Sequence, residues 1–132
     1  MSLAVDLDKF AASAIAKVER TRRGVCLKLF GAIIRDTPVL TGRLRGNWQT
    51  SLASPLLGEL PLRPEAAAVG EMMVAVQSMH GDVPIFFRNN LPYAARIEYD
   101  GWSHTKAPAG MVRKNVAQVM RLVAEAVREG RL

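Results

Sequence analysis

The chain has 132 residues, of which 49% are hydrophobic and 23% are charged, and its net charge is +6. These values exclude wholesale disorder and fit a single α+β domain, residues 1–132, with a buried core. The single cysteine, Cys26, excludes an internal disulfide. No apolar run reaches the ~20 residues that span a bilayer, and the start lacks a basic-then-apolar signal pattern. We therefore expect a protein that stays soluble where it is made and does not contact a membrane.

The positive charge is concentrated at the two ends of the chain. Residues 1–35 carry seven Lys or Arg against three Asp or Glu, and residues 106–132 carry six against two. Residues 47–105 carry three against six, so basic ends flank an acidic middle. Solvated helix faces are the simplest explanation. The functional explanations are complementary packing of subunits or proximity to DNA, since summed charge steers association without determining a fold.

A long helix is predicted at the start of the chain. Asp6 or Asp8 can cap its first turn, and it should end before Pro38, because the residue before a proline is pushed out of the helical region. We expect its apolar stripe to face the core, with Phe10 as an anchor. The stripe consists of residues that recur every three or four positions: Leu7, Phe10, Ala14, Val18, Thr21, Val25, Leu29 and Ala32.

A turn-rich loop and a strand follow. Residues 37–46 contain Gly42 and Gly46, which supply backbone freedom. Residues 47–53 then alternate between apolar and polar, which is typical of a half-buried strand. Its alternate residues from Trp48 onward face one side, so we expect Trp48 to be a core anchor.

A second helix is predicted after a loop at residues 54–63. Pro64 suits a first helical position and Glu65 favours the positive end of a helix. Apolar residues then recur at helical spacing up to about Met79, although residues 72–78 are also compatible with a strand.

The last third of the chain should contain a strand and a helix. Residues 83–88 resemble a short strand, with Pro84 at its beginning or on an edge because proline lacks a ladder donor. Residues 92–102 fit either a short helix or an extended segment. The final helix opens after Pro108, and we take Val116 and Val123 as its core anchors. Its apolar stripe is Val112, Val116, Val119, Val123 and Val127.

Together these elements predict an α+β domain. Two long helices, one N-terminal and one C-terminal, should pack on a small and mostly antiparallel sheet, with a third, shorter helix in the middle.

No grouping of residues suggests catalysis, a metal or a cofactor. His80 and His104 each follow a turn signal, and with Cys26 they are too scattered for a metal site or a nucleophile–base pair. Glu98 and Asp100 have the chemistry of an acid and base pair, but neighbouring acidic residues in a loop more often have structural roles. We predict no catalytic residue, no bound metal and no cofactor.

A glycine-rich basic segment is the main candidate for anion binding. Residues 41–46 combine two glycines with Arg43 and Arg45, which could hold a phosphate or a carboxylate. The chain has neither a GxxxxGK[ST] nor a GxGxxG phosphate cradle. Its tryptophans and tyrosines lie in the acidic middle and not among the basic residues, which argues against a platform for stacking nucleic-acid bases.

Aromatic side chains between the two predicted terminal helices suit core or interface positions. Those with a polar tip are Trp48, Tyr93, Tyr99 and Trp102. Trp102 is the most interface-like, because Gly and Ser flank it. Arg96 and Glu98 would share one face of an extended segment and could set the register between subunits. A solvated ion pair that contributes at most about 1 kcal/mol explains them equally well.

Two motif blocks lie between the terminal helices. They read T-P-V-L-T-G-R-L-R-G-N-W at residues 37–48 and N-L-P-Y-A-A-R-I-E-Y-D-G-W-S at residues 90–103, and A-P-A-G-M-V-R follows at residues 107–113. In this order the chain resembles the tail-completion (neck) proteins of long-tailed bacteriophages, a family that includes minor tail proteins. The resemblance covers about residues 5–129.

The resemblance implies a non-enzymatic structural protein that joins or seals the head–tail interface of a virion after assembly in the host cytoplasm. Its expected partners are copies of itself in a ring around the DNA path and a tail terminator, tail tube or head stopper protein. We expect residues 37–46 and 54–62 to be mobile before assembly. The hypothetical assembly interface consists of Arg43, Arg45, Tyr93, Arg96, Glu98 and Trp102. The alternative is a small basic nucleic-acid-associated protein.

Overall fold

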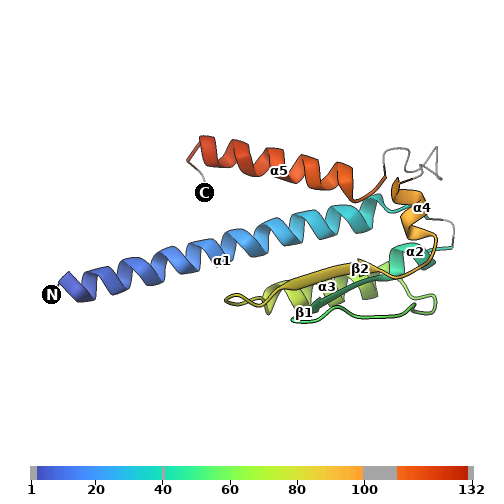
Figure 1. Ribbon diagram of the computed structural model, residues 1–132, viewed down its shortest axis with the longest axis horizontal. Coiled ribbons are helices and arrows are strands. Elements are labelled where there is room, and N and C mark those ends of the chain that lie inside the picture. The colour runs from blue at the N-terminus through green and yellow to red at the C-terminus, as the bar shows by residue number, and fades with distance from the viewer. Residues whose placement is uncertain (1–2, 40, 100–109, 131–132) are drawn as a thin grey trace.

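The structure is a computed structural model that describes residues 3–39, 41–99 and 110–130. It combines helices with a small antiparallel sheet, which confirms the α+β class (Figure 1). The elements in chain order are α1 (Leu3–Asp36), α2 (Arg43–Gly46), β1 (Trp48–Leu52), α3 (Glu65–Gln77), β2 (Ile85–Asn89), α4 (Ala94–Tyr99) and α5 (Arg113–Arg128).

Helix α1 is the central element of the fold. Helix α5 runs antiparallel along one side of it, and α3 with the β1–β2 sheet lies on the opposite side (Figure 1). The two strands are antiparallel, with Trp48 opposite Asn89 and Leu52 opposite Ile85. The N-terminal helix is long, at 34 residues, and the C-terminal helix has 16. Within the described residues, α3 and the C-terminal half of α1 pack against the sheet, whereas α5 packs on α1.

An aromatic stack joins the sheet to α1. The ring of Phe87 in β2 lies between Trp48 of β1 and Phe30 of α1, with centroid distances of 4.5 and 4.4 Å. Trp48 is buried, which confirms it as a core anchor, and its indole N–H donates to the hydroxyl of Thr37 at 2.9 Å. The fully buried Ile34 packs in the same cluster. The core therefore gathers where α1 ends and β1 begins.

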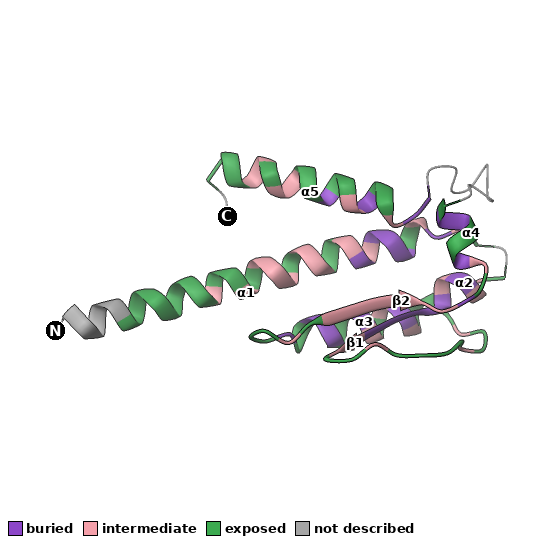
Figure 2. Ribbon diagram, in the orientation of Figure 1, coloured by how far each residue is buried: buried purple, intermediate pink, exposed green. Residues whose placement is uncertain are grey.

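Phe10 is not a core anchor, because its side chain is 74% exposed. The N-terminal part of α1 extends past the end of α5 and past the sheet, so its apolar stripe has no covering layer (Figures 1 and 2). The helical periodicity of the stripe was predicted correctly, but the prediction that the stripe faces the core was wrong for this part of α1. Helix α1 also begins at Leu3, so neither Asp6 nor Asp8 lies at its start.

The anchors predicted on α5 also need correction. Val116 and Val123 are only half-buried, whereas Val119, from the same stripe, is 6% exposed and Val127 is 59% exposed. The stripe is covered near the start of α5 and becomes exposed towards Arg128, where the helix leaves α1 (Figure 2).

Two segments for which the sequence left alternatives open are helical in the structure. Residues 72–77 are helical, and residues 94–99 form the short helix α4. Pro84 precedes β2, as its missing donor requires, and its carbonyl accepts a hydrogen bond from the Ala53 N–H at 2.9 Å. The loop predicted at residues 37–46 contains the single turn α2. The expected mobility of that loop stays a prediction.

Two isoleucines on α1 provide a matched test of where the core lies. Ile34→Ala should lower the free energy of unfolding by about 2–5 kcal/mol, because Ile34 is fully buried. Ile15→Ala should change it by less than about 0.5 kcal/mol, because that side chain is 61% exposed. Urea unfolding of dilute protein measures both values. Equal losses at the two positions would contradict this arrangement of the core.

Candidate assembly surface

The carboxylate of Glu98 connects α4 to the start of α5. Its oxygens accept hydrogen bonds from the backbone N–H groups of Met111 at 2.8 Å, Val112 at 3.0 Å and Arg113 at 2.7 Å. The first N–H groups of a helix lack partners within the helix and form its positive end. Because Val112 provides no capping side chain, Glu98 supplies the missing acceptor from another helix. We call these contacts the Glu98 clasp.

The clasp also involves Arg113 and Gly110. The Arg113 guanidinium lies 3.5 Å from a Glu98 carboxylate oxygen and donates to the Glu98 carbonyl oxygen. Gly110 has a φ of 82°, and a Cβ built there would lie 2.5 Å from the Glu98 carboxylate. Only glycine avoids both the backbone strain and the clash. The A-P-A-G-M-V-R segment thus ends in residues that enclose one carboxylate.

Glu98 therefore does not face a neighbour as expected. Its side chain is 6% exposed and its acceptors are used within the chain. Burial raises the pKa of this carboxyl. The backbone N–H groups of Arg113, Val112 and Met111, together with the Arg113 charge, lower the pKa by more than burial raises it. The pKa therefore lies below its ordinary value of 4.5. The clasp thus holds an ionised carboxylate.

Arg45 has a similarly internal role. Its guanidinium donates to the carbonyl of Arg35 at 2.8 Å and to that of Thr37 at 2.7 Å, and it pairs with Glu65 at 3.2 Å. These carbonyls lie at the C-terminal end of α1, where the helix leaves acceptors without partners. The basic loop therefore uses Arg45 to hold the end of α1.

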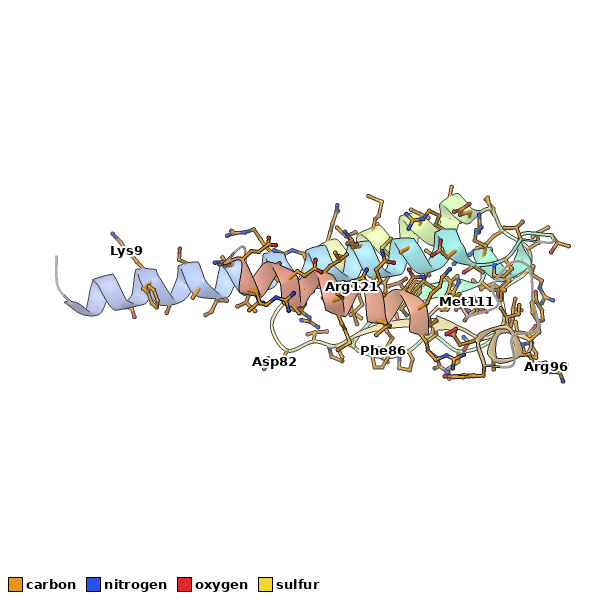
Figure 3. All side chains as sticks on the ribbon, turned by 90° about the horizontal axis from the view of Figure 1, so that it is seen from above. Lys9, Asp82, Phe86, Arg96, Met111 and Arg121 are labelled. Carbon is orange, nitrogen blue, oxygen red and sulfur yellow. The ribbon has the colours of Figure 1, made fainter. Side chains whose placement is uncertain are left out.

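Arg43 and Arg96 are the predicted site residues with surface positions. Arg43 pairs with Glu59 at 3.0 Å, and the two side chains are 41% and 43% exposed. Arg96 is exposed on α4 and points outward in Figure 3. Because residues 94–99 are helical, Arg96 and Glu98 face different ways and do not share a surface. Both α2 and α4 lie at the end of the molecule where α1 ends and α5 begins (Figure 1).

The two aromatic candidates have different outcomes. Tyr93 is half-buried and packs against the core cluster, so it contributes to the core more than to the surface. Trp102 lies outside the described residues. Tyr99, which follows Glu98, is 68% exposed, and the Arg113 guanidinium carbon lies 4.9 Å from its ring centroid.

Sequence reasoning missed the side-chain contacts to the loop that joins β1 to α3, whose expected mobility at residues 54–62 stays a prediction. The buried Asn47 amide donates to the Leu60 carbonyl at 3.1 Å and accepts from the Leu60 N–H at 2.8 Å. Gln49 and Asn90 both donate to the Gly58 carbonyl. Polar amides at buried strand positions were the signal for these contacts. The loop nevertheless presents exposed leucines, which are Leu56 at 41%, Leu57 at 80% and Leu62 at 63%.

The described side chains suggest no metal site, since no three His, Cys, Asp or Glu residues among them gather in one place. A surface depression of about 350 Å³ lies beside the end of α1, where Arg45 and Lys114 contribute to its wall. Lys114 is 3.6 Å from Asp36, and Arg45 is bound as described above. Within the same described part of the chain, no helix has the length and apolarity to cross a membrane.

Comparison with known proteins adds no relative to this description. No family model, curated protein or solved structure matches the chain.

The Glu98 clasp predicts a specific loss of stability. Glu98→Gln should lower the free energy of unfolding at neutral pH by about 1–3 kcal/mol, because the buried N–H groups lose a charged acceptor. Glu59→Gln, at an exposed ion pair, should cost at most about 1 kcal/mol. Urea unfolding of both variants measures the difference.

The same clasp should respond to acid. The folded-state pKa of Glu98 is depressed, so its carboxylate contributes stability above the unfolded pKa near 4.5 and loses it as pH falls through the folded-state pKa. The stability gap between the native chain and Glu98→Gln should shrink over that range. A gap that stays constant down to the acid transition would show that the charge has no such role.

Proposed function

We propose that the chain is a non-enzymatic phage structural protein, a tail-completion or neck component that joins or seals the head–tail interface. The observation that carries the proposal is the number of large apolar side chains that lie exposed on different elements. Phe10 on α1 is 74% exposed, Leu57 in the β1–α3 loop is 80% exposed and Val74 on α3 is 66% exposed. Val74 adjoins the exposed Met73, and Leu57 adjoins the exposed Leu56. Adjoining exposed apolar side chains are typical of surfaces that other proteins cover.

The motif residues support this proposal through their structural roles. In the first block, Thr37, Arg45 and Trp48 connect the end of α1 to β1. In the second block, Glu98 connects α4 to α5. The described residues of both blocks therefore connect the helices and the sheet to one another as a frame. A frame of this kind suits a protein whose task is to present surfaces to its neighbours.

In this proposal several copies form a ring around the DNA path in the virion neck. The ring contacts a tail terminator, a tail tube or a head stopper protein. The two terminal helices form the long antiparallel pair of each subunit and carry most of the positive charge, while the acidic middle offers a complementary surface. In this proposal the α2–α4 end, which carries Arg43 and Arg96, docks to a different neck protein.

The alternative is a small basic nucleic-acid-associated protein, which the basic α1 and α5 favour. Part of that charge has an internal use, however. Arg22 donates to the carbonyls of Gly81 and Val83, and Arg23 donates to that of Met79. These contacts fasten α1 to the α3–β2 connection. These guanidinium groups keep their positive charge, but the N–H donors that hold the carbonyls do not contact phosphate groups at the same time.

The first test adds the purified chain to a lysate of its phage in which the gene for this chain has been deleted. Restored attachment of tails to heads, counted by electron microscopy and plaque titre, is the expected result. Failure to restore attachment, together with DNA binding whose affinity falls steeply with salt, would favour the alternative.

Two arginine variants sharpen this test. Arg43→Glu should keep the thermal unfolding temperature and reduce head–tail joining, because Arg43 is a surface residue. Arg45→Glu should lower the unfolding temperature by several degrees, because its contacts to the end of α1 are lost. Unchanged joining by Arg43→Glu would remove the α2–α4 end from the proposed docking surface.

A further inference from the structure

One edge of the two-stranded sheet has main-chain groups without hydrogen-bond partners. The Ala53 N–H donates to the Pro84 carbonyl, so every second pair of residues from there exchanges main-chain hydrogen bonds between β1 and β2. Ile85, Phe87 and Asn89 lie at the positions in between, where the N–H and C=O groups point away from β1. Within the described residues these groups have no hydrogen-bond partner. We call the three residues the β2 edge.

The opposite edge of the sheet, on β1, is closed by side chains of the same chain. Arg63 donates to the Trp48 carbonyl at 2.9 Å, and the Thr50 N–H donates to the Glu71 carboxylate at 2.9 Å. Helix α3 packs along β1, and Figure 3 shows Phe86 of β2 on the side of the molecule away from α3. Proteins normally block a strand edge with such contacts, with proline or with lysine, because an open edge pairs with other chains. The β2 edge contains neither a proline nor a lysine.

We propose that the β2 edge binds an extended segment of another protein as a third strand of the sheet. Main-chain N–H and C=O groups at alternate residues match an extended backbone, which presents its own acceptors and donors at the same spacing. A third strand would also extend a sheet that has only two strands, the smallest possible number. The proposal does not depend on the neck role, because it is drawn from the sheet alone.

The side chains of β2 indicate what the added strand carries. Phe87 stacks on Phe30 of α1, so Ile85 and Phe87 lie on the face of the strand that is directed at the core. Residues of the added strand beside them should be apolar. Phe86 and Arg88 lie on the opposite face, and within the described part of the chain Arg88 has no ion pair. A carboxylate opposite Arg88 would supply one, since opposite charges on neighbouring strands attract.

The charge of β2 favours a different protein over a second copy of the same strand. Residues 85–89 contain Arg88 and no carboxylate. Two β2 strands side by side would bring two Arg88 side chains to one small sheet and would supply a carboxylate to neither. The occupant is therefore an extended segment with apolar residues at alternate positions and an aspartate or glutamate on its other face.

Amide hydrogen exchange of the full chain, measured residue by residue by NMR, tests the added strand. The probe is a capped peptide of about seven residues in which valine alternates with threonine, with glutamate in place of the central threonine. At about 1 mM peptide, the amides of the β2 edge should exchange about fivefold more slowly than without it. The amides of Phe86 and Arg88 should not change, because they are directed at β1. N-methylation of one alternate set of peptide residues should abolish the slowing, and N-methylation of the other set should not, because only one set of amides faces β2.

Charge reversal tests the role of Arg88. The native chain should bind the glutamate peptide about threefold more tightly than the same peptide with lysine at that position, and Arg88→Glu should reverse the preference. Arg121→Glu, the same charge change at an exposed position of α5, should keep the native preference. Thermal unfolding shows whether both variants are folded. Equal binding of the two peptides by the native chain would reject the carboxylate partner.

Other results would overturn the proposal as a whole. One is slow exchange of the β2 edge amides in the dilute free chain, which would show that the edge is already paired. Others are an unchanged exchange rate with the peptide, or equal effects of the two N-methylated sets. Slowing that grows with the concentration of the chain alone would show that a second copy is the occupant. Each of these outcomes is read from the isolated chain and is independent of whether it restores head–tail joining.

Discussion

The position of α5 depends on the carboxylate of Glu98. Among the described residues of α5 itself, Asn115 and Val119 are buried and Val116 and Val123 are half-buried, so apolar packing on α1 and the clasp position the helix together. The clasp satisfies the backbone donors that open the helix, and Asn115 adds a hydrogen bond to Asp36 at the end of α1. Glu98 therefore joins α4 to α5, and Asp36 joins α5 to α1, at the same end of the molecule. The close approach also explains why residue 110 is a glycine, since any side chain there would displace the carboxylate.

Helical periodicity and strand alternation predicted the types of most elements, because those signals are local. They could not predict what covers each face. Phe10 and Leu29 belong to the same stripe, yet only the latter lies where other layers reach. The role of Glu98 was equally invisible to local patterns, because its donors come a dozen residues later in the chain. One signal was present: the last helix begins without a Ser, Thr, Asp or Asn to cap it, so its acceptor had to come from elsewhere.

Composition also overstated how many arginine side chains have all their hydrogen-bond donors available to partners. Arginine is the residue best suited to hold several carbonyl oxygens at once, because its guanidinium has five donors in a fixed plane. Arg63 donates to the carbonyls of Gly46 and Trp48 and lies 3.4 Å from Glu71, in a role that its position in a loop did not suggest. With Arg22 and Arg45 it belongs to a set of arginines that fasten loops and helix ends. A count of charges cannot separate such residues from those that face solvent.

The unbroken course of α1 has a consequence for any assembly built from this chain. The same helix of 34 residues runs from the core to its exposed N-terminal part, a length of roughly 50 Å. The number of residues between the core and Phe10 therefore sets the direction in which the exposed apolar face of α1 points. Adding or removing a single residue would turn that face by about 100° about the axis. The curvature of an assembly, and whether it closes on itself, would then be encoded in the length of one helix.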